Sequence, residues 1–143
     1  MRLKKGFTLV ELLLAAAILA FVLSGMLLLF TNCFVLNGTS RNLSIATSHA
    51  NYIMEEIRAN GFTGLGAKIT SNNGTPAGWD FNAAQLQASP YNLVPLANES
   101  IATSILSGSP GDDPLEVSVA VNWQDRGAKN RSVELTTRIT NYR

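Results

Sequence analysis

The sequence predicts an α+β protein with the shape of a ladle, in which a small antiparallel β-sheet packs on the second half of a long N-terminal helix. Three observations predict it. A long apolar run extends from Leu12 to Phe30. An apolar stripe at three- and four-residue steps follows between Leu36 and Ile57. Near the C-terminus, apolar and polar residues alternate from Leu115 to Trp123 and again from Val133 to Ile139.

The first half of the predicted helix, residues 7–36, is long enough to span a bilayer, which takes about 20 apolar residues. Within its apolar run only Ser24 and Gly25 interrupt the pattern. A secretory signal peptide would also place basic residues before an apolar run. This run, however, is longer than the apolar region of such a peptide, and no small-x-small site follows it. We therefore expect a retained transmembrane helix.

The orientation of that helix follows from its flanks. Arg2, Lys4 and Lys5 precede it, and basic residues mark the cytoplasmic end of a membrane helix. The rest of the chain is then expected in the periplasm or outside the cell.

The second half of the helix, residues 37–60, is amphipathic. A break is possible at Asn37-Gly38, whereas Asn60-Gly61 is the expected end, because glycine suits the position just past a helix. A helix from Phe7 to Asn60 would be roughly 80 Å long. Its apolar stripe consists of Leu36, Leu43, Ala46, Ala50, Ile53, Met54 and Ile57.

The remaining residues, 61–143, are expected to form a globular head. Glycine and proline recur throughout 61–114, which predicts a variable loop with short strands at Asn92–Leu96 and Ile101–Leu106. Residues 115–140 predict a β-hairpin with its turn between Gln124 and Asn130. Two strands alone are marginally stable, so the hairpin needs the helix and a further strand. Three aromatic residues of the loop are expected to anchor it on the core, rather than to form a binding patch: Trp79, Phe81 and Tyr91.

Glu11 is the residue of the apolar half that most needs an explanation. A charged side chain at membrane depth costs about 2.5–3.5 kcal/mol. The next charged residue along the chain is Arg41, so Glu11 needs a partner from outside its own helix or a reason to be tolerated. One such reason is that Glu11 lies near the membrane edge and extends toward the headgroups.

The segment Gly6-Phe7-Thr8-Leu9-Val10-Glu11 resembles the class III signal peptide of type IV pilins and pseudopilins. The resemblance implies that a prepilin peptidase removes residues 1–6 by cutting after Gly6 and methylates the new N-terminus at Phe7. Phe7 and Glu11 lie about one helical turn apart, so Glu11 could pair with this amine within its own helix. The resemblance implies instead that Glu11 meets the N-terminal amine of a neighbouring subunit and so sets the register of the filament. The implied partners are other pilin or pseudopilin subunits, the peptidase, an inner-membrane assembly platform and membrane lipid.

Two further segments resemble a subgroup of this family. The helix end Ala50–Phe62 is similar to that of PilV-type minor pilins, and the C-terminal hairpin is similar to both that group and the minor pseudopilins of type II secretion. Major pilins commonly place a proline in the apolar half of the helix, whereas the first proline here is Pro76. The pattern therefore favours a minor subunit.

These features predict a structural subunit of a type IV filament, which waits in the bacterial inner membrane and is not an enzyme. A minor pseudopilin of a type II secretion system is the alternative within the same architecture. The alternative from another class is a single-pass anchor for a binding domain, in which Gly6 is not cleaved and Glu11 is incidental.

Other candidate sites have simpler explanations. The net charge of +1 and the lack of a basic run give no support for nucleic-acid binding. His49, the single histidine, is expected to be a surface or half-buried polar residue rather than a general base. Asp112-Asp113, in the loop 108–114, supplies too few oxygen ligands for calcium and predicts a turn, so no metal or cofactor is expected. Cys33, the single cysteine, is expected to be a packed small hydrophobe, with an intermolecular disulfide as the alternative.

Overall fold

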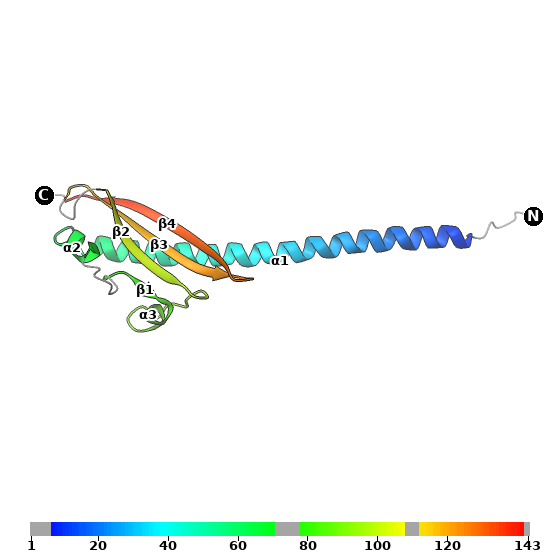
Figure 1. The fold of residues 1–143 in the computed structure, drawn as a ribbon, viewed down its shortest axis with the longest axis horizontal. Coiled ribbons are helices and arrows are strands. Elements are labelled where there is room, and N and C mark those ends of the chain that lie inside the picture. Colours follow the sequence, from blue (N-terminus) through cyan, green and yellow to red (C-terminus); the bar gives the residue numbers. More distant parts are fainter. Residues whose placement is uncertain (1–6, 71–77, 108–111, 142–143) are drawn as a thin grey trace, which may run out of the picture. The chain divides into compact units, whose positions relative to one another are not determined.

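The computed structural model describes residues 7–70, 78–107 and 112–141 and confirms the α+β class (Figure 1). The chain divides into two compact units, an N-terminal unit up to Thr39 and a C-terminal unit from Ser40 onward. The elements in chain order are α1 (Leu9–Ala59), α2 (Leu65–Thr70), β1 (Phe81–Asn82), α3 (Ala83–Gln87), β2 (Ser100–Ser107), β3 (Leu115–Asp125) and β4 (Lys129–Ile139).

The described part of the N-terminal unit is the first part of α1. The helix continues through Gly25 and through Asn37-Gly38, so the break considered at Asn37-Gly38 does not occur. A glycine in a helix costs about 1 kcal/mol relative to alanine, which the good helix formers around it outweigh. The hydroxyl groups of Ser24 and Thr31 donate to the carbonyl oxygens four residues earlier, at 2.8 and 2.9 Å, so these polar side chains are satisfied within the helix.

The C-terminal unit is built around a four-stranded antiparallel sheet in the order β1-β2-β3-β4. Strands β3 and β4 form the predicted hairpin, and β2 supplies the further strand expected at Ile101–Leu106. The hairpin strands are longer than the alternation indicated, because the pairs Gln124↔Asn130 and Asp125↔Lys129 extend the ladder through polar residues. Only residues 126–128 remain for the turn, with Gly127 at φ 76°.

The core of this unit lies between the C-terminal part of α1 and one face of the sheet. The predicted helix stripe supplies the helix side from Ala46 to Ile57, and alternate residues of β3 supply the sheet side. The stripe was wrong at Leu36 and Leu43, which are exposed because the core begins only at Ala46. The helix ends at Ala59, and Gly61 adopts φ 73°, the left-handed conformation expected just past a helix. The buried hydrophobic residues from α1 and β3 are Ala46, Ala50, Ile53, Met54, Ile57, Leu115, Val117, Val119, Val121 and Trp123.

The loop aromatics anchor the long connection as predicted. Trp79 and Phe81 are buried in the core, and Tyr91 packs against it with its ring 4.8 Å from that of Phe81. The Tyr91 hydroxyl donates to a carboxylate oxygen of Glu56 at 3.2 Å. Burial, and then the negative charge of Glu56, raises the pKa of Tyr91 above its ordinary value.

The prediction of a strand at Asn92–Leu96 was wrong, because this segment is an irregular loop. Asn92 has φ 49°, outside the range of an extended strand. The backbone N–H groups of Asn92 and Leu93 donate to the carbonyl oxygens of Ala88 and Leu86, so they are not available for a sheet ladder.

Candidate functional site

The candidate site is the start of α1. Gly6 lies outside the described residues. Phe7 and Thr8 precede the first helical residue, Leu9, and the Phe7 side chain is exposed. Glu11 occupies the first turn of the helix.

Thr8 and Glu11 form a reciprocal pair of contacts that begins the helix. The Thr8 hydroxyl and the Thr8 backbone N–H both donate to Oε2 of Glu11, at 2.8 and 2.9 Å. In return, the Glu11 backbone N–H donates to the Thr8 hydroxyl oxygen at 3.3 Å. This is a capping box, which satisfies backbone N–H groups that have no partner within the helix. The carboxylate also lies at the helix end where negative charge is favourable.

This capping box is the feature that the sequence reasoning missed. The sequence prediction considered charged partners only, so Glu11 was expected to need a partner from outside its helix or another reason to be tolerated. The pattern Thr-x-x-Glu before an apolar run is itself the signature of a capping box. Glu11 therefore has a local structural role at the start of α1.

The N-terminal unit presents an apolar surface along its described length. Large apolar side chains from Phe7 to Leu36 are exposed on the isolated chain, and the charged residue among the described residues of this segment is Glu11. Among the described residues, α1 is the one helix that is long and apolar enough to cross a membrane. An exposed apolar surface of this extent needs lipid or other helices to cover it.

His49 and Glu99 form a buried pair in the C-terminal unit. His49 Nδ1 lies 2.7 Å from Oε1 of Glu99, and both residues are buried, so the expectation of a surface or half-buried histidine was wrong. The other carboxylate oxygen of Glu99 accepts the backbone N–H of Leu96 at 2.6 Å. Both groups are thereby engaged in holding the segment before β2 against α1, which is a structural role.

The remaining candidates are Cys33 and the pair Asp112-Asp113. Cys33 is exposed on the described part of the N-terminal unit and has a free thiol. Asp113 accepts the backbone N–H of Asn141 at 3.2 Å, and part of the loop 108–114 lies outside the described residues. Within the described ranges, no group of three or more metal-binding side chains comes together.

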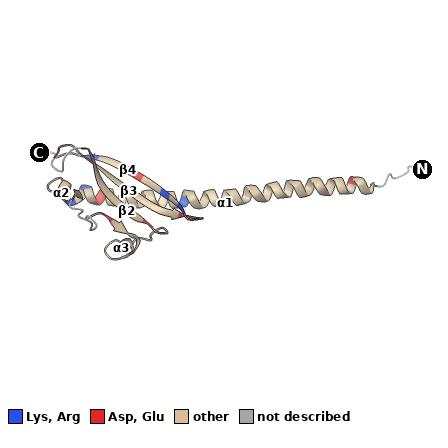
Figure 2. Ribbon diagram, in the orientation of Figure 1, with Lys and Arg blue, Asp and Glu red and all other residues tan. Residues whose placement is uncertain are grey.

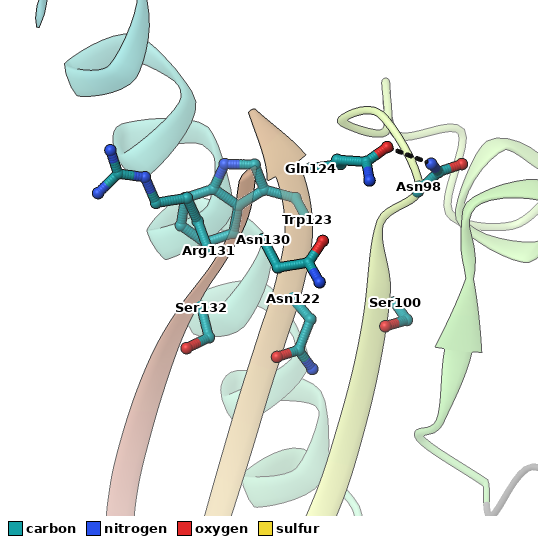
Figure 3. A pocket seen from close by; sticks show the side chains of 8 residues that line it. All are labelled: Asn98, Ser100, Asn122, Trp123, Gln124, Asn130, Arg131 and Ser132. Carbon is teal, nitrogen blue, oxygen red and sulfur yellow. Dashed lines mark hydrogen bonds between the residues drawn. The ribbon is translucent and has the colours of Figure 1, made fainter. Parts of the chain in front are cut away.

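A hollow of about 400 Å³ lies across one end of β2, β3 and β4 (Figure 3). The register places Ser100, Asn122 and Ser132 side by side at its floor. Its lining supplies amide and hydroxyl groups and one arginine, but no residue suited to act as a general base. The full lining is Asn98, Ser100, Asn122, Trp123, Gln124, Asn130, Arg131 and Ser132.

Comparison with known proteins identifies the N-terminal segment. Residues 1–27 match the model of the prokaryotic N-terminal methylation motif. The chain matches no curated protein and no solved structure. The chain therefore carries a type IV pilin-like class III signal, which marks structural subunits rather than enzymes and implies assembly with other pilin subunits. Together with the apolar helix, the signal indicates membrane anchoring.

Proposed function

We propose that this chain is a minor structural subunit of a type IV filament. The observation that carries the proposal is the methylation motif at residues 1–27, which includes the first part of α1 with its exposed apolar side chains. A subunit that moves from a membrane into a filament has two requirements. It needs a signal for N-terminal processing, and it needs a helix that lipid or other helices can surround.

The precursor waits in the inner membrane with its N-terminus in the cytoplasm and its globular head in the periplasm. Residues 1–6 form the leader and residues 7–36 the membrane and filament-core segment. Residues 37–60 form the amphipathic half of the helix, which carries the head, residues 61–143. The basic residues of the leader support this orientation.

Prepilin peptidase cuts the Gly6–Phe7 bond, and the new α-amine of Phe7 is methylated. The amine is a cation that the precursor lacks. A carboxylate in hydrocarbon gains far more from a nearby cation than it does in water, so Glu11 pairs with the amine of a neighbouring subunit as the helices bundle. The Thr8 backbone N–H and hydroxyl remain after this cut, so the capping box keeps the first turn ordered while the subunit moves from the membrane into the filament.

A minor pseudopilin of a type II secretion system uses the same signal and the same helix. The lack of a proline before Pro76 favours a minor subunit in either system. The docking partner at the membrane is the assembly platform in both cases.

The proposal predicts processing that depends on one enzyme. We expect the chain to start at methylated Phe7 when it is produced with prepilin peptidase, and at Met1 when the peptidase is absent. Intact mass and N-terminal sequencing of the membrane-extracted protein measure both states. A Gly6→Leu variant is the matched control and should keep its leader in the presence of the peptidase.

A different N-terminus would overturn the proposal. A chain that keeps Met1 with active peptidase present would be a plain membrane anchor. A cut near the outer end of the apolar run would instead make the C-terminal unit a secreted domain.

A further inference from the structure

The turn of the β3–β4 hairpin is bound to α1 shortly after the apolar run ends. The Asn42 side chain donates to Oδ1 of Asp125 at 3.2 Å, and the same oxygen accepts the Arg126 backbone N–H at 2.9 Å. The Asp125 side chain is 8% exposed. This contact joins residues that are 83 positions apart in the sequence.

Four basic residues that are dispersed in the sequence flank this contact, and the register pairs two of them, Lys129 and Arg131, with residues at the end of β3. Arg41 precedes Asn42 on α1, and the other three lie in the turn and at the start of β4 (Figure 2). All four are exposed, and the Nε of Arg131 lies 3.7 Å from the Asp125 carboxylate. The residues at this contact therefore carry four positive charges and the single negative charge of Asp125. We call this group the basic collar: Arg41, Arg126, Lys129 and Arg131.

The length of the chain limits how far the basic collar can lie from a membrane. A bilayer with its headgroups is about 40–45 Å thick, and a helix of about 27–30 residues spans that distance. Residues 7–36 have that length. Arg41 follows five positions later, about 7–8 Å along a helix and at most about 18 Å along an extended chain. The Debye length at physiological ionic strength is about 8 Å. If the chain between residue 36 and Arg41 is helical, Arg41 therefore lies within reach of the phosphate charges at the membrane surface.

We propose that the basic collar binds anionic phospholipid headgroups on the surface from which the C-terminal unit emerges. The inference rests on the membrane placement under the proposed function. Its chemistry is attraction between guanidinium or ammonium groups and lipid phosphate, to which each basic residue near an anionic surface adds about fivefold in affinity. The contact holds the C-terminal unit close to the bilayer in the stored precursor, and entry into a filament requires its release.

Two lysines of the described chain make a direct test possible, because Lys129 belongs to the basic collar and Lys68, on α2, does not. The full-length precursor is reconstituted into vesicles of phosphatidylcholine alone or of phosphatidylcholine with phosphatidylglycerol. A membrane-impermeant amine-acylating reagent is added, and mass spectrometry gives the acylation rates of both lysines. We expect phosphatidylglycerol to lower the ratio of the Lys129 rate to the Lys68 rate about fivefold, and high salt to restore it.

Matched variants assign the effect to the basic collar. Arg126→Gln should weaken the protection of Lys129, whereas Arg138→Gln removes the same charge from the far end of β4 and should leave the protection unchanged. An equal Lys129-to-Lys68 ratio in the two vesicle types would overturn the inference, and so would protection of Lys129 by added duplex DNA but not by phosphatidylglycerol. Vesicle flotation separates this failure from that of the proposed function, since a chain that does not float with either vesicle type lacks the membrane helix itself.

Discussion

Replacing Glu99 by alanine is expected to lower the free energy of unfolding of the C-terminal unit by about 2–5 kcal/mol, because each buried polar group left without a partner costs about 1–3 kcal/mol. Glu99 is 2% exposed and holds both His49 and the backbone N–H of Leu96. The alanine variant leaves both groups buried without their acceptor. The loss also frees the segment before β2 from α1.

Tryptophan fluorescence during chemical denaturation in detergent measures this loss. Trp79 and Trp123 are both buried in the core of the C-terminal unit, so their emission reports that unit rather than the membrane helix. Glu55→Ala is the control, because its ion pair with Arg58 is largely exposed and should be worth at most about 1 kcal/mol.

A Glu99→Ala variant as stable as the wild type would show that the buried pair does not support the fold. The His49→Ala variant and the double variant complete the test. If the two side chains act as a pair, the double variant should lose less than the sum of the two single losses. Additive losses would mean that each residue acts through separate contacts.

Much of the fold was predictable because its strongest signals are local. The stripe on α1 and the alternation along β3 each repeat within one element, so the sequence indicates most of the residues that face the core. Periodicity does not show where the core begins along α1, and so the stripe was wrong at Leu36 and Leu43. Gly61 ends the helix at the predicted place because it supplies the positive φ needed there. The prediction of a strand at Asn92–Leu96 failed although it also used a local pattern. The apolar residues of this segment are typical of a strand, but Asn92 has a positive φ that a strand does not allow.

The features that were missed depend on contacts between distant residues. His49 and Glu99 are 50 positions apart, and no periodicity indicates that they meet. The basic collar depends on the contact of Asn42 with Asp125, 83 positions away, so runs of basic residues in the sequence do not indicate it. The capping box of Thr8 and Glu11 does not depend on distant contacts. Its pattern is present in the sequence, but only charged partners of Glu11 were considered.

Glu11→Gln is expected to reduce incorporation of the subunit into filaments by about tenfold or more, whereas Thr8→Val should reduce it far less. Glutamine keeps an oxygen that can accept from Thr8, so the capping box survives while the charge is lost. Thr8→Val removes the hydroxyl but retains the Thr8 backbone N–H and the Glu11 charge. The two variants thus separate the charge of Glu11 from its role in starting the helix.

The measurement is the ratio of the subunit in sheared filaments to that left in the membrane, with leader removal checked on the same samples. If the charge meets a neighbour's amine, the Glu11→Gln subunit is processed but stays in the membrane, because burying that amine without an opposite charge is strongly unfavourable. The reverse pattern, with Thr8→Val excluded and Glu11→Gln incorporated, would assign Glu11 to the capping box alone. The apolar surface of α1 would then have to set the register of the filament without help from a charge pair.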